Sequence, residues 1–518
     1  MTKSTSQFRT VIGLEVHVQL LTRTKLFCGC STKFGLPPNS ATCPVCLGLP
    51  GVLPVMNRKA FDLALKAALA LNCRIAPFTK WDRKNYYYPD LPKNYQISQY
   101  DLPFSQGGYL EIESAAGARR IRIIRVHLEE DAGKSLHDES GGGGHSRVDL
   151  NRAGTPLLEI VSEPDITSPE EARAYLEEIR LLLRELEVSD CEMQEGSLRC
   201  DANVNIHIPK ENSSFAATPI VEVKNLNSIR GVERAMKYEA QRQFDEFQKK
   251  IGQQWEVWLE DPKVFGSAKI FHVRERKNGE LVEVSKATAG WDDRKEITEI
   301  QRRKEEASDY RYFPEPDLVP VTVSPAKVEE IQAGLGELPA AQRTRLQSQH
   351  GLSAYDAGVL SRQGRAFVAY FEEVVQQCGD AKEACNWTTN EVLQTLNDRK
   401  LAIKEFPVSA PSLANLIGEI KRTELNKQRA REVFAEMLSG SSAKDAMSKL
   451  GIKVMADEGQ LRDLIRRAIA ANAKAVADFK KGKTKAADAI KGAVMRETKG
   501  MAKTDLVQKL LLEELESV

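Results

Sequence analysis

The segment V-I-G-L-E-V-H-V-Q-L, residues 11–20, decides the fold of the first part of the chain. Its residues alternate strictly, with Ile12, Leu14, Val16, Val18 and Leu20 on one face and Glu15, His17 and Gln19 on the other. This period of two predicts a β-strand whose apolar face is buried and whose polar face lines a cavity. Glu15 and His17 would lie roughly 6–7 Å apart at their Cα atoms, close enough to reach a common ion. A half-exposed strand with incidental polar residues would show the same pattern.

Two later segments repeat this one-sided pattern. Residues 199–208 place Asp201, Asn203, Asn205 and His207 opposite Ala202, Val204, Ile206 and Ile208, and residues 221–224 add Glu222 and Lys224. Antiparallel sheets tolerate one polar face, whereas parallel sheets are buried on both. We therefore expect a curved antiparallel sheet whose concave face is lined by polar side chains.

The densest group of reactive side chains is R-V-H-L-E-E-D-A-G-K-S, residues 125–135. Three adjacent acids, Glu129, Glu130 and Asp131, are costly to crowd together unless solvent, a cation or a basic ligand offsets their charge. Ile123 and Ile124 break the preceding alternation, which predicts a β-bulge that re-aims the side chains after it. A solvated strand end is the alternative, but a cavity shared with Glu15 and His17 explains all the polar strand faces together.

Four of the nine cysteines, Cys28, Cys30, Cys43 and Cys46, lie within one loop rich in glycine and proline. Two close cysteine pairs can supply the four thiolates of a tetrahedral zinc site, which would be structural because four thiolates close the coordination shell. Four incidental buried thiols are the alternative. The loop at residues 81–100 mixes aromatic, proline and basic residues, and its Arg83 and Lys84 are candidates for phosphate contacts. A packed surface loop would also account for this composition.

The pattern after residue 325 changes to short amphipathic helices with almost no strand signal. With helices expected at 57–71, 168–188 and 227–247 among the earlier strands, the chain is predicted to be α+β. We expect a domain built on this curved antiparallel sheet at 1–325 with a zinc-binding loop at 28–46, an all-α domain at 326–442, and a small all-α tail domain at 443–518. The tail is locally basic, and Lys480, Lys481, Lys483 and Lys485 suit contacts to an RNA backbone, although a solvated charged face would look alike.

Composition and charge limit the classes of protein to which this chain can belong. The chain has 518 residues, 28% charged residues and a formal net charge of +1, so any RNA contact must come from a local basic surface. No apolar run approaches the length that spans a membrane, and the first ten residues lack the apolar core of a signal peptide. Clustered cysteines suit a reducing compartment. We expect a bacterial cytoplasmic location, with an organellar matrix as the alternative.

Several long motifs together resemble the B subunit of the tRNA-dependent amidotransferases, the GatB/GatE family. They are V-I-G-L-E-V-H-V, D-R-K-N-Y-Y-Y-P-D-L-P-K-N-Y-Q-I-S-Q, L-E-E-D-A-G-K, V-D-L-N-R-A-G-T-P-L-L-E-I-V-S-E-P-D, G-S-L-R-C-D-A-N-V-N, K-N-L-N-S and D-Y-R-Y-F-P-E-P-D. They span most of residues 11–318. The resemblance implies a ligase that converts Glu-tRNA(Gln) or Asp-tRNA(Asn) into Gln-tRNA(Gln) or Asn-tRNA(Asn), with glutamine as the amido donor. It also implies a cradle-like catalytic domain, a helical domain and a small tail domain that binds tRNA. The B subunit is expected to act in a heterotrimer with an amidase (glutaminase) subunit, which releases ammonia, and a small third subunit.

The resemblance implies a reaction that uses ATP to phosphorylate the side-chain carboxylate before ammonia attacks it. Glu130, His17, Glu15 and Lys84 are then the expected catalytic residues, and Mg²⁺ is expected on Glu15, His17, Glu129 and Glu130. The remaining candidates for binding ATP or the substrate are Arg83, Lys134, Glu159, Glu195, Asp201, Asn203 and Lys224. The cysteine set matches family members that carry zinc, while other members lack it, so the zinc would not be catalytic.

Two other functions remain open from the residues. A carboxylate–metal phosphatase or nuclease acting on RNA could use the same acidic cluster, and a non-catalytic tRNA-binding scaffold could use the zinc loop and tail.

Overall fold

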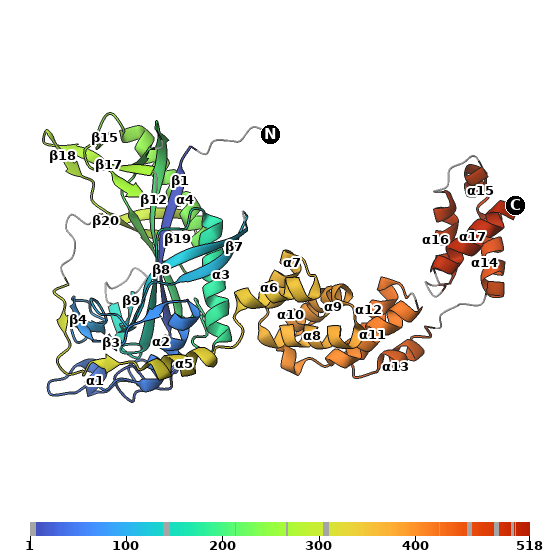
Figure 1. Ribbon diagram of the computed structural model, residues 1–518, viewed down its shortest axis with the longest axis horizontal. Coiled ribbons are helices and arrows are strands. Elements are labelled where there is room, and N and C mark those ends of the chain that lie inside the picture. Colours follow the sequence, from blue (N-terminus) through green and yellow to red (C-terminus); the bar gives the residue numbers. More distant parts are fainter. Residues whose placement is uncertain are drawn as a thin grey trace. The chain divides into compact units, whose positions relative to one another are not determined.

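The computed structural model describes residues 7–115, 117–137, 146–212, 214–265, 268–303, 310–423, 425–452, 458–480, 486–498, 502 and 504–517. The chain divides into two compact units, Met1–Leu338 and Pro339–Val518. Figure 1 shows the strands gathered in the first unit and helices throughout the second. Each unit has an apolar core of its own.

The first unit is built on a central sheet that contains residues 11–20. Strand β1 (Arg9–Gln19) lies between β12 (Leu198–Lys210) and β11 (Pro156–Ser162), and β11 is followed by β8 (Gly117–Glu130). All three pairings are antiparallel. Ile12, Leu14, Val16 and Val18 are completely buried, whereas Glu15 and His17 are half-buried on the other face. The predicted strand and its two faces are confirmed.

Eleven further strands extend this sheet to fifteen among the described residues. They are β2 (Arg74–Ile75), β6 (Ser105–Gln106), β7 (Tyr109–Ser114), β13 (Ser214–Ala217), β14 (Val221–Lys224), β15 (Trp255–Val257), β16 (Lys263–Phe265), β17 (Ala268–Lys277), β18 (Glu280–Glu283), β19 (Ala287–Asp292) and β20 (Ile297–Arg303). Two pairings, β13 with β17 and β14 with β19, are parallel. The sheet is therefore mixed rather than wholly antiparallel, while the predicted α+β class is confirmed.

The predicted β-bulge lies in β8. Val161 of β11 is opposite Arg125, and the next residue, Ser162, is opposite Ile123, so Ile124 has no counterpart. An extra residue of this kind reverses which faces the later side chains of the strand occupy. It places Arg125, His127 and Glu129 on the polar face, while Val126 and Leu128 are completely buried.

Three helices cover the apolar face of the sheet. They are α2 (Arg58–Ala70), α3 (Pro169–Glu185) and α4 (Ile229–Lys250), and each begins after a residue, Asn57, Ser168 or Ser228, whose side chain accepts a backbone N–H of the first turn. Their apolar stripes form one core with β1, β8, β11 and β12. In Figure 1, α3 lies to one side of β8, and β4 (Asp82–Asn85) and β9 (Lys134–His137) lie to the other.

Short strands form three small sheets beside the polar face. These pair β21 (Phe313–Pro314) with β4 (Asp82–Asn85) and β5 (Tyr95–Ser98), β22 (Val321–Thr322) with β3 (Phe78–Thr79), and β9 (Lys134–His137) with β10 (Ser146–Asp149). The cysteine loop contains only the short helix α1 (Pro44–Leu47). Helix α5 (Pro325–Ala333) packs on α2, so residues 326–338, which were expected in the helical domain, lie in the first unit.

The described part of the second unit is helical and contains two separate apolar clusters. The first is formed by α6 (Pro339–His350), α7 (Ala354–Ser361), α8 (Arg365–Cys378), α9 (Ala381–Trp387), the π-helix η1 (Thr388–Val392), α10 (Leu393–Arg399), α11 (Ala410–Thr423), α12 (Lys427–Met437) and α13 (Ala443–Lys449), with a 3-10 turn η2 (Ile403–Glu405) beside it. The second is formed by α14 (Glu458–Ala471), α15 (Ala473–Lys480), α16 (Ala487–Glu497) and α17 (Thr504–Ser517). Helix α13, which was expected to open the tail domain, belongs to the first cluster through Ala443, Ala446 and Met447. Across the described ranges, no helix combines the length and the apolar character needed to cross a membrane.

Candidate active site and metal centre

The strand register places four charged or titratable side chains in one row across the polar face of the sheet. His17 of β1 is directly opposite Arg199 of β12 on one side and Glu159 of β11 on the other, and Glu159 is opposite His127 of β8. Directly opposite residues of antiparallel strands project from the same face. Four segments that are far apart in sequence therefore meet in a single site.

Three members of this face form a candidate metal centre. One nitrogen of His17 and one carboxylate oxygen each of Glu129 and Glu159 lie within 4.8 Å of one another. His17 Nε2 is 3.5 Å from Glu159 Oε2 and 3.8 Å from Glu129 Oε1. Two carboxylates and a histidine around one point can bind a divalent cation, and carboxylate oxygens are the ligands that Mg²⁺ favours.

The pKa values of the side chains in this cluster are shifted by the charges of their neighbours. Burial lowers the pKa of His17, but its hydrogen bond to Glu159 and the charges of Glu159 and Glu129 outweigh burial and raise it to about 9. Burial raises the pKa of Glu159, yet His127 and His17 hold it well below its ordinary value. The cluster is therefore a charged site, in which a proton on His17 offsets the two carboxylates that a cation would otherwise neutralise.

Lys84 of β4 supplies a positive charge beside this cluster. Burial lowers the pKa of its ammonium group, but the charges of Glu129 and Glu159 raise it above the ordinary value. The ammonium nitrogen lies 5.0 Å from the ring centre of Tyr310 and 5.9 Å from that of Tyr86. A cation held between aromatic rings and facing carboxylates is well placed to meet an anionic ligand.

Two hydrogen-bonded pairs, Glu15 with Asn203 and Asp201 with Lys224, lie on the same face of the sheet as His17. Asn203 Nδ2 donates to Glu15 Oε1 at 2.8 Å, and Lys224 Nζ contacts Asp201 Oδ2 at 2.5 Å. Burial and the charge of Glu159 raise the pKa of Glu15, against the hydrogen bond from Asn203. These four predicted residues thus lie on the expected face, but Glu15 is not one of the three clustered ligands.

Glu130 lies apart from the cluster, although Glu129 is its neighbour in β8. Its carboxylate accepts the backbone N–H of Ile97 at 2.9 Å and the ammonium group of Lys93, and it lines a recess with Cys28 and Cys46. Glu129 and Glu130 are both 3% exposed, so neither is the solvated strand end that the sequence left open. Glu130 was expected to lie with Glu15 and His17, but the structure places it apart from them.

Three other predicted site residues lie elsewhere. Arg83 Nε and Nη2 contact the two oxygens of the buried Glu315 at 2.7 and 2.8 Å, so its guanidinium group is already paired. Lys134 is exposed at the start of β9. Glu195 is exposed and lines a separate polar cavity of about 240 Å³ with Lys33 and Asp190.

The structure also adds residues to the site that were not predicted from the sequence. His127 Nε2 is 3.3 Å from Glu159 Oε2 and 3.9 Å from Glu129 Oε2, so it contacts both carboxylates. Arg199 Nη2 contacts Asp131 Oδ2 at 2.8 Å, and Gln19 Nε2 donates to the same oxygen at 2.8 Å. Burial raises the pKa of Asp131, but Arg199 and Arg152 lower it further than burial raises it. One feature of the sequence could have indicated His127 as a site residue, namely its position two residues before Glu129.

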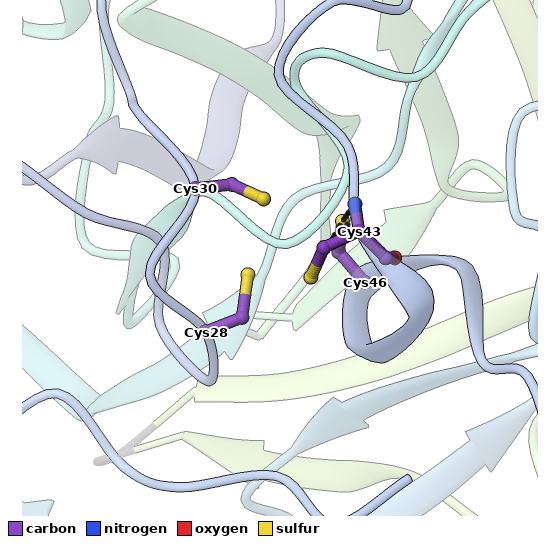
Figure 2. Close-up of side chains that lie close together, drawn as sticks. All are labelled: Cys28, Cys30, Cys43 and Cys46. Carbon is purple, nitrogen blue, oxygen red and sulfur yellow. Dashed lines mark hydrogen bonds between the residues drawn. The ribbon is translucent and has the colours of Figure 1, made fainter.

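The four clustered cysteines form a second candidate metal centre. Their sulfur atoms lie within 4.8 Å of one another, and those of Cys43 and Cys46 are 3.9 Å apart. Figure 2 shows the four side chains directed into one space from two facing stretches of the loop. A tetrahedron with metal–sulfur bonds of about 2.3 Å has sulfur atoms roughly 3.8 Å apart, so this donor set fits a tetrahedral metal ion.

Lys25 lies against this cysteine cluster in an unusually buried position. It is 1% exposed, and its ammonium nitrogen is 3.5 Å from Cys46 Sγ and 3.4 Å from the carbonyl oxygen of Leu150. The Cys43 N–H also donates to Cys46 Sγ, at 3.1 Å. The neighbouring Cys28 thiol, the Cys43 amide and the Lys25 charge together lower the pKa of the Cys46 thiol to about 4, against burial. Cys46 is thus the cysteine that is held as a thiolate, whereas the hydrogen bond to Cys46 raises the pKa of Cys28 and burial raises that of Cys30.

Most of the tail lysines that were predicted to contact RNA lie outside the described residues. Lys481, Lys483 and Lys485 lie outside them, and Lys480 ends α15 with its side chain outside them. Two other basic residues of the tail form ion pairs inside it. Arg462 and Arg466 of α14 contact Glu514 of α17 at 3.1 and 2.8 Å. These ion pairs join two helices of the second apolar cluster.

Comparison with known proteins gives one consistent result. The family described as "GatB/GatE catalytic domain" matches residues 10–329, and that described as "GatB domain" matches residues 369–515. A protein of Rhodopirellula baltica, named as the B subunit of an aspartyl/glutamyl-tRNA(Asn/Gln) amidotransferase, is 50% identical over 97% of this chain and 96% of its own length. Proteins of the same name from Moorella thermoacetica and Carboxydothermus hydrogenoformans are 47% and 45% identical, over 98% of this chain and 100% and 99% of their own lengths.

Proposed function

The chain belongs to the GatB family, the B subunits of the aspartyl/glutamyl-tRNA(Asn/Gln) amidotransferases, and from this premise we propose how its site works. It is a ligase subunit that forms the amide of Gln-tRNA(Gln) or Asn-tRNA(Asn) from the misacylated Glu-tRNA(Gln) or Asp-tRNA(Asn). The names of the relatives favour this reaction over the phosphatase, nuclease and scaffold alternatives. The observation that carries the proposed mechanism is the group formed by His17, Glu129 and Glu159 beside the Lys84 ammonium.

The chemistry requires an activated carboxylate, because an oxide ion is too poor a leaving group for direct attack by ammonia. Transfer of the γ-phosphoryl group of ATP to the carboxylate oxygen gives an acyl phosphate and ADP. Ammonia then attacks the carbonyl carbon, phosphate leaves with the bonding electrons, and loss of a proton gives the amide. Phosphoryl transfer depends on positioning and charge neutralisation more than on covalent help from the protein.

Glu129 and Glu159 would hold Mg²⁺, and His17 would join them by giving up the proton that it carries in the metal-free site, with Glu15 beside them. The ion would neutralise the phosphate oxygens when it is bound. Lys84 would contact the transferred phosphoryl group from the other side, since its ammonium already faces the carboxylate cluster. His127 contacts Glu129 and Glu159 and would fix the orientation of both carboxylates.

The other components follow from the premise. The chain would receive ammonia from an amidase (glutaminase) subunit within a heterotrimer that includes a small third subunit, and it would act in the bacterial cytoplasm. A structural Zn²⁺ on Cys28, Cys30, Cys43 and Cys46 would fix the loop that lines the recess of Glu130. The tail domain, with Lys480, Lys481, Lys483 and Lys485, would bind the tRNA.

The decisive experiment measures amide formation on charged tRNA by the reconstituted complex, with either glutamine or free ammonia as donor. His17→Ala and Glu159→Gln should each lower ATP-dependent amide formation at least about 10²-fold even with free ammonia, because they remove cation ligands. Glutamine hydrolysis by the partner enzyme should survive at least in part. Full transamidation in either variant contradicts the assignment.

A matched control and one further variant sharpen the result. Glu111→Gln removes a carboxylate from β7 whose partner Arg120 is largely exposed, and it should leave amide formation unchanged. Glu130→Gln should also reduce amide formation, for a different reason: it leaves the Lys93 ammonium without its carboxylate in a buried position.

A further inference from the structure

The segment at residues 310–317, Y-R-Y-F-P-E-P-D, lies along β4 although more than 220 residues separate the two in sequence. Its strand β21 pairs with β4, with Phe313 opposite Arg83 and Pro314 opposite Asp82. Backbone hydrogen bonds fix both ends: Asn85 N–H donates to Tyr310 O at 3.0 Å, and Glu315 N–H donates to Trp81 O at 2.8 Å. The 310–317 segment is therefore the outer strand of the small sheet that carries Lys84.

Arg83 and Glu315 join these two strands on one face of that sheet. The guanidinium group binds both oxygens of Glu315, at 2.7 and 2.8 Å, and also contacts Asp317 at 3.2 Å. The Glu315 side chain has no exposed surface, and the guanidinium carbon lies 4.3 Å from the ring centre of Tyr95. A two-point contact of this kind fixes orientation as well as distance, which a lysine could not do.

Lys84 leaves β4 on the opposite face, because successive residues of a strand alternate. On that face lie the rings of Tyr310 and Tyr86, and Ser98 of β5, whose hydroxyl donates to Glu129 Oε2 at 3.5 Å. Tyr312 stacks on Tyr100 with ring centres 3.9 Å apart and planes 7° apart. The rings that surround Lys84 therefore come partly from the 310–317 segment itself.

The backbone of the segment is held in a conformation that needs support. Arg311 lies between the two tyrosines and has a φ of 44°, in the left-handed region that side chains with a Cβ rarely adopt. Asn85 Nδ2 donates to its carbonyl oxygen at 2.7 Å. Contacts to β4 must hold this conformation, because the residue itself does not favour it.

We propose that Arg83 and Glu315 form a clamp that positions Lys84 by holding the 310–317 segment against β4. Arg83 is then a positioning residue and makes no contact with phosphate. This inference rests on the proposed function only in that Lys84 meets the ATP phosphates. Its structural part, the retention of the segment by the ion pair, stands independently.

Neutralising Glu315 separates the clamp from direct phosphate binding by Arg83. If Arg83 bound phosphate, Glu315→Gln would release its guanidinium group, and ATP would bind as well as before or better. If the pair is a clamp, Arg83→Gln and Glu315→Gln act in the same direction. Both loosen the segment, displace Lys84 and lower kcat/KM for ATP, by up to about 10²-fold for a displacement of about 1 Å.

The experiment combines hydrogen exchange of the full-length chain with kinetics of the reconstituted complex. In Arg83→Gln and Glu315→Gln, peptides covering residues 81–86 and 310–317 should exchange at least about tenfold faster than in the wild type, while peptides from β1 and β11 keep their rates. Arg120→Gln is the matched control, since it removes an arginine from an exposed pair with Glu111 and should change neither measurement. Arg83→Lys keeps the charge and serves if either neutral variant fails to fold; it should show faster exchange of the same peptides.

Two results overturn the clamp. One is unchanged exchange of residues 81–86 and 310–317 in a folded variant. The other is a Glu315→Gln complex whose kcat/KM for ATP is equal to or above that of the wild type. Failure of the proposed function would look different: the wild-type complex would form no amide with ATP, while the exchange measurement would still decide whether the ion pair holds the segment.

Discussion

Neighbouring residues in this site perform different tasks because their side chains leave a strand on opposite faces. Glu129 reaches His17 and His127, whereas Glu130 accepts hydrogen bonds from Ile97 and Lys93. Likewise Lys84 faces the carboxylates, whereas the adjacent Arg83 binds Glu315. The two adjacent glutamates therefore have different partners, and so do the two adjacent basic residues. Alternation within the strand divides each pair between the candidate site and a structural contact.

The cysteine cluster gives a prediction at the scale of single residues. We expect about one zinc per chain by elemental analysis, and its loss in Cys43→Ser/Cys46→Ser, because two of four ligands are removed. Lys25→Met should keep the ligands but release zinc to a chelator faster, since the ammonium beside Cys46 offsets thiolate charge in a buried place.

A cysteine outside the cluster provides the control for zinc content. Cys378, whose thiol contacts the carbonyl oxygen of Asp380, can be replaced by serine without touching the loop, and zinc should be unchanged. Zinc retained at the wild-type level in Cys43→Ser/Cys46→Ser would refute the site.

At the scale of elements, the register of four strands creates the site. Strand β1 lies at its centre, with β12 and β11 on either side, and the row from Arg199 through His17 and Glu159 to His127 depends on that alignment. A slip of one residue in any strand would turn its polar side chains toward the apolar core. Helices α2, α3 and α4 prevent this, because the buried face of β1 packs against their apolar stripes.

The start of α3 gives a prediction about pH. Glu171 accepts hydrogen bonds from the Thr167 N–H at 2.8 Å and from Arg119 at 2.6 Å. Burial raises the pKa of Glu171, but these contacts lower it below the ordinary value of 4.5. A lowered pKa in the folded state stabilises the protein at pH values above 4.5, and this stability is lost as pH falls through the lowered value.

Glu171→Gln should therefore lower the free energy of unfolding by about 2 kcal/mol at pH 7, as expected for hydrogen bonds to a charged group. The difference from wild type should shrink below about pH 4.5, where the wild-type carboxylate loses its charge. Urea unfolding at both pH values measures this. Glu170→Gln is the control, since Glu170 is an exposed acid of the same first turn, and an equal loss in both variants would contradict the explanation.

At the scale of the whole molecule, the candidate site is separate from the helical region that follows it in the sequence. The site lies wholly in the first unit, and the described helices of the second have apolar clusters of their own. Because α13 belongs to the first of these clusters, a cut before Ala443 would expose that core. A cut after Ile452 removes only the second cluster.

Truncation after Ile452 should weaken binding of charged tRNA and raise its KM, with a smaller effect on kcat, because the tail is proposed to contact the RNA backbone. In the full-length complex, replacing Lys480, Lys481, Lys483 and Lys485 by Gln should flatten the dependence of log K on log salt by up to about four units if each lysine neutralises one phosphate. Lys474→Gln, at an exposed position of α15, tests the contribution of a basic residue outside this run. Unchanged tRNA affinity across a salt series in the truncated complex would exclude the tail as a binding element.

The sequence by itself determined several of the longer elements of this protein and which of their faces are polar. Alternation fixed β1 and β12, the doublet Ile123–Ile124 fixed the bulge of β8, and the spacing of four cysteines fixed the second candidate metal centre. These are local properties, because the periodicity of a strand and the spacing of cysteines in a loop depend only on residues that are close together in sequence. The motifs also identified the family.

Only the tertiary structure decided which polar residues meet. His127 joins Glu129 and Glu159 because β8 and β11 are paired in a particular register, and Arg83 is removed from the site because residues 310–317 return to bind it. Partners more than a hundred residues away leave no periodic trace beside the residues they contact. Pairing between distant strands is selected by burial of the whole apolar face, and that choice exists only once the chain has folded.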